Sequence, residues 1–132
     1  MVKVFLGGTC NESKWREELI KHIAIDYFNP VVEDWTPECM EEELKQRESC
    51  DYVLYVITPS MTGVYAIAEV VDDSNKRPMK TLFCFISEST RCFTKGQERS
   101  LKAVGKMVMG NGALWFEDLP TVAEYLNKQK EK

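Results

Sequence analysis

The sequence lacks the features that mark membrane, secreted and nucleic-acid-binding proteins. No apolar run approaches the roughly 20 residues of a transmembrane helix, and the opening residues MVKVFLGG have neither the apolar stretch nor the cleavage site of a signal peptide. Positive charge is not in excess, because 17 lysines and arginines stand against 21 aspartates and glutamates. We therefore expect a soluble cytoplasmic protein that binds neither a membrane nor a nucleic-acid polymer.

Histidine and paired cysteines are scarce as well. His22 is the single histidine, and the five cysteines are an odd set without a CxxC pair. A disulfide framework is not expected, a metal site has too few candidate ligands, and the sequence predicts no cofactor. The cysteines are interpreted as reduced and partly buried. Cys10 is of most interest because it lies in the loop after the first predicted strand.

Strand and helix signals alternate along the chain. Its 132 residues, 44% of them hydrophobic, are enough for one domain over 1–132. This alternation predicts an α/β fold, a three-layer (βα)5 doubly wound parallel sheet with the flavodoxin-like strand order 2-1-3-4-5. We expect strands over 3–7, 26–29, 51–58, 81–87 and 113–117, and helices over 13–25, 36–50, 62–74, 94–110 and from 118 onward.

Three of these elements carry strong local signals. Thr36 precedes Pro37, which is the pattern of a helix cap followed by a proline at the first helical position. Thr94 and Gln97 have the spacing of a capping box. The segment DYVLYVIT (51–58) is apolar on both faces, which is typical of a central parallel strand.

In this fold, ligands bind at the carboxyl ends of strands one and three, where the strand order reverses. The loops 7–11, 29–35 and 59–63 should therefore surround a site. In the first loop, Gly7 and Gly8 either form a plain tight turn or let a ligand approach the backbone near a helix N-terminus. Lys14 and Arg16 in the helix that follows are either phosphate ligands or solvated charges.

The second loop carries a large aromatic residue, which loops normally lack. Trp35 either covers the edge of the core or forms an aromatic wall for a flat ligand, with Asn29 or Asp34 reading the polar edge of that ligand.

A carboxylate lies in the apolar stretch after the third loop. Glu69 either faces solvent or is held by partners, because unpaired burial is costly. Tyr65 lies one turn earlier on the same helix face and is a candidate partner. Within the acidic run 41–43, most of which suits a solvated face, Glu43 is placed to point toward the same crevice. Two carboxylates in one cleft is the arrangement that breaks glycosidic bonds.

The order of these segments resembles the nucleoside 2-deoxyribosyltransferase-like family over about residues 3–75. The resemblance rests on FLGGT with the polar loop that follows and Trp15-Arg16, FNP with Asp34 and Trp35, ELKQRESCDYVLYVITPS and TGVYAIAE. It implies the same doubly wound sheet and an enzyme that cleaves the N-glycosidic bond of deoxyribonucleosides or nucleotides. The sugar then passes to water or to another base.

The resemblance also implies roles for single residues. Glu69 corresponds to the nucleophile that forms a glycosyl-enzyme ester, and Glu43 falls where the family usually has a supporting aspartate. Six residues before the nucleophile the family commonly has an aspartate or serine, whereas this chain has Gly63, so that Ser60 or Thr62 would substitute. The candidates for contacting base or sugar are Asn11, Asn29, Asp34 and Trp35.

Catalytic members of the family are commonly homo-oligomers, and the C-terminal aromatic residues Trp115, Phe116 and Tyr125 are predicted to be exposed at such an interface. Two other functions fit the same residues: a non-catalytic nucleotide-binding module and a nicotinamide-nucleotide glycohydrolase. A receiver domain is disfavoured, because Thr58, Pro59 and Ser60 stand where a receiver needs an aspartate. A flavin site is disfavoured because GGTCNES matches a phosphate loop only weakly.

Overall fold

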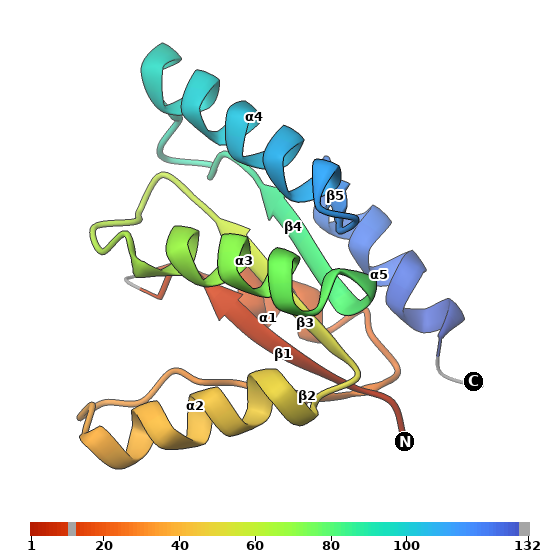
Figure 1. The fold of residues 1–132 in the computed structure, drawn as a ribbon. Coiled ribbons are helices and arrows are strands. Elements are labelled where there is room, and N and C mark those ends of the chain that lie inside the picture. Colours follow the sequence, from red (N-terminus) through yellow and green to blue (C-terminus); the bar gives the residue numbers. More distant parts are fainter. Residues whose placement is uncertain (11–12, 130–132) are drawn as a thin grey trace.

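The computed structural model describes residues 1–10 and 13–129, and in this part a five-stranded sheet lies between two layers of helices (Figure 1). No helix in the described part is both long and apolar enough to cross a membrane. The strands are β1 (Lys3–Gly8), β2 (Asp26–Phe28), β3 (Tyr52–Ile57), β4 (Thr81–Phe85) and β5 (Leu114–Phe116). The helices are α1 (Trp15–Ile20), α2 (Pro37–Ser49), α3 (Tyr65–Lys76), α4 (Lys95–Gly110) and α5 (Leu119–Lys128), with a short 3₁₀ turn at Pro78–Lys80.

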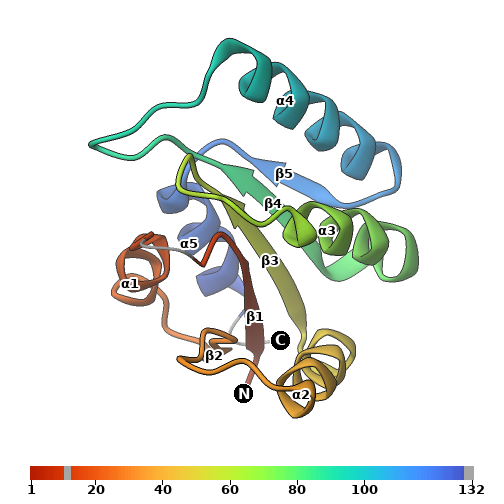
Figure 2. The ribbon, with the colours of Figure 1, turned by 90° about the vertical axis from the view of Figure 1, so that its left-hand side faces the viewer.

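The strand order is β2-β1-β3-β4-β5 and every pairing is parallel, which confirms the predicted fold. Helices α1 and α5 cover one face of the sheet, and α2, α3 and α4 cover the other (Figure 2). The strand order reverses between β1 and β3, so the carboxyl ends of these two strands form the crevice in which ligands of such sheets bind.

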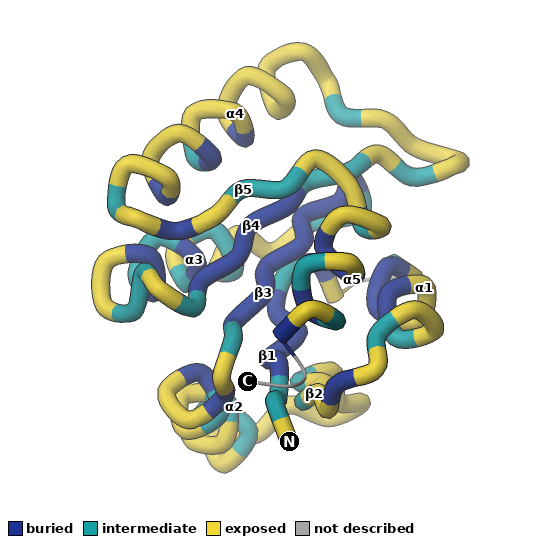
Figure 3. The backbone as a smooth tube through the Cα atoms, turned by 90° about the vertical axis from the view of Figure 1, so that its right-hand side faces the viewer, coloured by how far each residue is buried: buried dark blue, intermediate teal, exposed yellow. Residues whose placement is uncertain are grey.

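The core follows the two-residue period of the strands. On β1, Val4 and Leu6 pack against the layer of α1 and α5, whereas Phe5 packs against the opposite layer. The central strands are the most deeply buried part of the backbone (Figure 3). On β3 every residue from Val53 to Ile57 is inaccessible to solvent, which is why its sequence is apolar on both faces.

The predicted starts of α2 and α4 are confirmed, whereas α1 and α3 begin two and three residues later than predicted. Thr36 caps α2, and Thr94 with Gln97 forms the complete capping box of α4. Helix α1 ends at Ile20, earlier than predicted, because Asn127 of α5 binds the backbone of the residues that follow, where the helix would otherwise continue. Its side chain accepts a hydrogen bond from the amide of Ala24 and donates one to the carbonyl of His22.

The prediction of an exposed aromatic surface near the C-terminus is wrong. Trp115 is half-buried and stacks on Phe85 with 5.9 Å between ring centroids. Gly105 of α4 allows this packing, because a Cβ atom there would lie 2.5 Å from the indole. Phe116 and Tyr125 pack against each other at 5.3 Å. These rings therefore hold β5 to the helices and are not a free surface.

Candidate active site

The loop after β1 is fixed to the end of β3. Gly8 has a φ of +111°, and a Cβ atom at this position would lie 2.1 Å from the carbonyl oxygen of Val56, so that only glycine fits. The amide of Thr9 donates to the same carbonyl at 2.9 Å, and the Thr9 hydroxyl accepts a hydrogen bond from the amide of Thr58 at 2.9 Å. The two strand ends are thereby held in one rigid unit.

Arg16 of α1 holds the end of β1 and the loop after it by hydrogen bonds to backbone carbonyls. Its side chain is buried and donates to the carbonyl of Leu6 at 2.9 Å and to that of Thr9 at 2.6 Å. Burial lowers the pKa of Arg16, and the neighbouring Cys10 and Glu43 oppose that effect. Arg16 is therefore a structural clamp on backbone carbonyls and neither a solvated charge nor a free phosphate ligand.

Glu88, in the loop after β4, connects the segment after β1 to the loop after β3. Glu88 accepts hydrogen bonds from the amide of Ser60 at 3.1 Å, from the Ser60 hydroxyl, and from the Ser13 hydroxyl at 3.0 Å. Burial raises the pKa of Glu88, but these hydrogen bonds outweigh burial and lower the pKa below its ordinary value. We call Glu88 with Ser13 and Ser60 the loop clasp. Both the amide and the hydroxyl of Ser60 donate to Glu88 within this clasp.

A cavity of about 320 Å³ opens at the crevice between β1 and β3. Both candidate carboxylates, Glu69 and Glu43, line it, and so do four of the residues that we predict to bind substrate: Trp35, Thr62, Gly63 and Tyr65. The remaining lining residues are Gly8, Thr9, Cys10, Met40, Met61 and Ala66.

Trp35 lies at the rim of this cavity. Its indole Nε1 donates to the Glu43 carboxylate at 3.4 Å, and 57% of the residue is exposed. An indole so exposed does not cover the core. It stands beside Glu43 as a wall of the cavity, which favours the interpretation that a flat ligand packs against it.

Glu69 faces the cavity from the second turn of α3. Its side chain is only 13% exposed, and its Oε2 atom lies 3.5 Å from Nη1 of Arg47, a residue of α2. Tyr65, the partner that helical spacing suggests, is more than half exposed and lines the cavity separately. The carboxylate is therefore held by an arginine from a neighbouring helix.

Arg47 is anchored by Asp73, the centre of a buried network. The Nε and Nη2 atoms of Arg47 donate to the two carboxylate oxygens of Asp73 at 3.1 and 3.0 Å. The Tyr55 hydroxyl and Arg77 also donate to Asp73, and Arg47 pairs with Asp72 at 3.0 Å. Among the described residues, no group of acidic, cysteine or histidine side chains is arranged to hold a metal ion.

Burial and neighbouring charges set the protonation of Glu69. Burial raises its pKa to about 7; Arg47 opposes this rise, whereas Glu43, Asp73 and Asp72 add to it. Burial and the Asp73 carboxylate also raise the pKa of Tyr55, so its hydroxyl remains a hydrogen-bond donor. The cavity thus holds a carboxylate that changes protonation near neutral pH.

Other residues from the predicted set lie elsewhere. Gly7 is buried beneath the ring of Tyr55, which a Cβ atom at position 7 would approach to 2.6 Å. The Asn29 side chain accepts a hydrogen bond from the amide of Val31 at 3.1 Å, within its own loop. Asp34 is exposed and, like Ser60, does not line the cavity. Asn11 lies outside the described residues. Substrate contacts by these residues stay predictions.

Sequence reasoning missed Arg47. It lies in the polar segment EEELKQRES, which has the composition of a solvated helix face. A signal was present, because Arg47 follows Glu43 by four residues and therefore shares its helix face. If Glu43 points into the crevice, a cation one turn later stands beside the same crevice.

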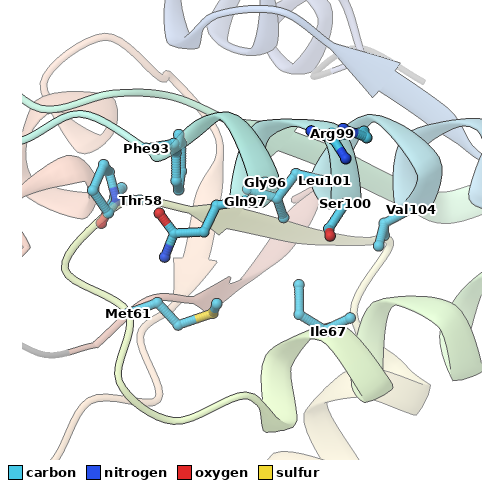
Figure 4. A pocket seen from close by; sticks show the side chains of 11 residues that line it. Thr58, Met61, Ile67, Phe93, Gly96, Gln97, Arg99, Ser100, Leu101 and Val104 are labelled. Carbon is cyan, nitrogen blue, oxygen red and sulfur yellow. The ribbon is translucent and has the colours of Figure 1, made fainter.

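A second cavity, of about 520 Å³, lies between α3 and α4 (Figure 4). Its walls include the apolar side chains of Ile67, Phe93 and Val104; the polar members are Thr58, Gln97, Arg99 and Ser100. Ile67 precedes Glu69 by two residues, so the two side chains leave α3 on different sides. Met61 lines both cavities and marks where they adjoin.

Comparison with known proteins decides the family. A sequence model described as nucleoside 2-deoxyribosyltransferase like matches residues 1–86. The chain belongs to the nucleoside 2-deoxyribosyltransferase-like family. The matched part contains every residue that lines the 320 Å³ cavity, and membership in this enzyme family implies nucleoside substrates. A search of curated proteins found no significant match.

Proposed function

We propose that this family member cleaves the N-glycosidic bond of a 2-deoxyribonucleoside or its 5′-phosphate through a glycosyl ester on Glu69. The observation that carries the proposal is the Glu69 carboxylate itself. It is largely buried, paired with an arginine, and turned into a cavity at the switch point of the sheet. A second carboxylate, Glu43, lines the same cavity, as glycosidic chemistry requires.

The reaction has two balanced steps. In the first, a Glu69 oxygen bonds to C1′ of the sugar while the C1′–N bond breaks; the base leaves with the bonding electrons and takes up a proton. In the second, water or an acceptor base attacks C1′ and loses a proton, and the ester electrons return to the Glu69 carboxylate. Two displacements at one carbon give net retention. Glu43 is the supporting carboxylate, and Trp35 offers a flat surface to the base.

Two measurements test the proposal together. The protein is incubated with deoxynucleosides, their 5′-monophosphates, ribonucleosides and nicotinamide mononucleotide, and free base is quantified by chromatography. Mass spectrometry then searches for a sugar adduct on the peptide that contains Glu69. We expect base release from deoxyribosyl substrates and an adduct on Glu69. Nucleotide binding without base release would overturn the proposal in favour of a non-catalytic binding module.

One observation favours that alternative. Position 63, where the family commonly has aspartate or serine, is a glycine that lines the cavity with no side chain to offer. A Cβ atom at Gly63 would meet nothing within 4 Å, so the cavity has room for the missing group. We expect Gly63→Ser to raise kcat/KM for a deoxynucleoside by about 3- to 10-fold, the value of one hydrogen bond.

The matched control is Gly110→Ser, which also places its side chain in open space but at the end of α4. This variant should leave kcat/KM at the wild-type value. Activity that appears only with Gly63→Ser would mean that the natural protein is the binding module. No change with Gly63→Ser would mean that position 63 is not a substrate contact.

The pH dependence of the reaction follows from Glu69. A nucleophilic carboxylate acts when ionised, and the pKa of Glu69 is raised to about 7, so kcat/KM should increase as pH rises through about 7 and level off above it. Because Glu43 contributes to the raised pKa, Glu43→Gln should move the midpoint to lower pH. Rates measured from pH 5 to 9 check both statements. A profile that is flat between pH 5 and 8 would contradict the role of Glu69.

A further inference from the structure

Arg47 stands between the buried core and the candidate nucleophile. Only 4% of its side chain is exposed. The Nε and Nη2 atoms form a two-point contact with both oxygens of Asp73, and Nη1 lies 3.5 Å from Oε2 of Glu69 as an ion pair. Because a two-point contact fixes the plane of a guanidinium, the position of Nη1 is set by Asp73 and not by Glu69.

Asp73 is in turn fixed to the sheet by Tyr55, whose hydroxyl donates to one of its oxygens. Arg77 pairs with the other oxygen from four residues further along the chain, so it ties Asp73 to no second element. Asp73 itself is fully buried. The chain of contacts therefore runs from β3 through Asp73 to Arg47 on α2, and from Arg47 back to Glu69 on α3.

We propose that Arg47 is a positioning residue, which holds Glu69 by its Oε2 atom and leaves Oε1 as the oxygen that attacks C1′. This inference rests on the function proposed above and deepens it. A side chain that is free at χ angles would place its carboxylate in several orientations, and only one of them aligns an oxygen with the reacting carbon. A guanidinium that Asp73 already holds in place restricts the Glu69 carboxylate to the orientation in which one oxygen is aligned with C1′.

The charge of Arg47 has a second effect in the same cycle. In the glycosyl ester Glu69 is uncharged, and the carboxylate reappears when water or a base displaces it from C1′. A guanidinium already in place stabilises that negative charge as it forms. Arg47 thus serves both steps through Glu69 and needs no contact with the substrate.

Arg77 provides a matched control. It also pairs with Asp73, but Glu69 is not among its ion-pair partners in the described part of the chain. Arg47→Lys and Arg77→Lys both keep the charge and both lose guanidinium contacts with Asp73. Arg47→Lys should lower kcat by about 100-fold while KM changes little, because misplacing a reacting group by about 1 Å costs that much. Arg77→Lys should stay within a few-fold of the wild type.

A second readout does not depend on activity. The titration of Glu69 is followed by NMR in protein labelled at the glutamate carboxyls, with Glu69→Gln used for assignment. Arg47→Met should raise the pKa of Glu69 above the wild-type value, and Arg77→Met should leave it close to that value. If Arg47→Met does not fold, the lysine pair of variants decides. The charged and titratable groups that face Glu69 are Arg47 and Glu43 from α2, Asp72 and Asp73 from α3 and Tyr55 from β3.

The outcomes separate the two proposals. If the wild type releases no base from any substrate, the proposed function fails, and the NMR titration still decides whether Arg47 is coupled to Glu69. If the wild type is active but the two lysine variants have equal kcat and equal pH profiles, Arg47 has only a structural role and the inference is overturned.

Discussion

Replacing Glu69 by glutamine is expected to reduce base release by about 1,000-fold or more, because the amide cannot form the glycosyl ester. Glutamine has the same shape as glutamate, and Arg47 keeps Asp72 and Asp73 as partners, so the fold should be retained. Base release from the best substrate of the wild type is measured for both proteins at pH 8, where the wild-type carboxylate is mostly ionised.

The control for this experiment is Glu41→Gln. Glu41 lies in the same acidic run as Glu43 but is exposed and does not line the cavity. Its variant should match the wild type in rate. A Glu69→Gln protein that keeps more than about a tenth of the wild-type rate would show that another group attacks the sugar, and the adduct search would then be extended to Glu43.

The largest expected loss of stability comes from Asp73→Ala. This change leaves Arg47 and the Tyr55 hydroxyl buried without their shared acceptor, and breaking a buried pair in this way typically costs about 3–5 kcal/mol. In a chain of this length that corresponds to a fall in Tm of roughly 10–20 °C. Urea and thermal unfolding followed by circular dichroism measure the change.

Asp72→Ala is the matched control, because Asp72 also pairs with Arg47 but its side chain is 43% exposed. Exposed pairs are worth at most about 1 kcal/mol, so this variant should unfold close to the wild type. If Asp73→Ala were no less stable than Asp72→Ala, the buried network would not be the main anchor of α2 and α3 to the sheet.

The fold could be predicted because its signals are local. The cap at Thr36, the capping box at Thr94 and the apolar strand before Thr58 each depend on a few neighbouring residues, and the alternation of these elements gives the topology. The early end of α1 could not be predicted, because it depends on Asn127, which lies more than 100 residues further along the chain.

The candidate site was predictable in part, because the topology that follows from the local signals also determines which loops meet. Topology alone places the ends of β1 and β3 together, and that was enough to bring Glu69 and Glu43 to one cavity. The partner of Glu69 required side-chain geometry between two helices, which no periodicity encodes. For Arg47 a site residue was overlooked. For Arg16 the reverse occurred: it was considered as a phosphate ligand, but it binds the backbone carbonyls of Leu6 and Thr9.

The loop clasp has a consequence for how a ligand would be received. Glu88 ties Ser60, in the loop after β3, to Ser13, so the part of the cavity rim that follows Ser60 is restrained before any ligand arrives. Ordering a loop on binding costs about 0.5–1.5 kcal/mol for each side chain that is immobilised, and this part of the rim avoids that cost. The segment with Trp35 has no such tie among the described contacts beyond its hydrogen bond to Glu43. Adaptation to a ligand should therefore be concentrated at Trp35, whereas the rim that follows Ser60 should keep its conformation on binding.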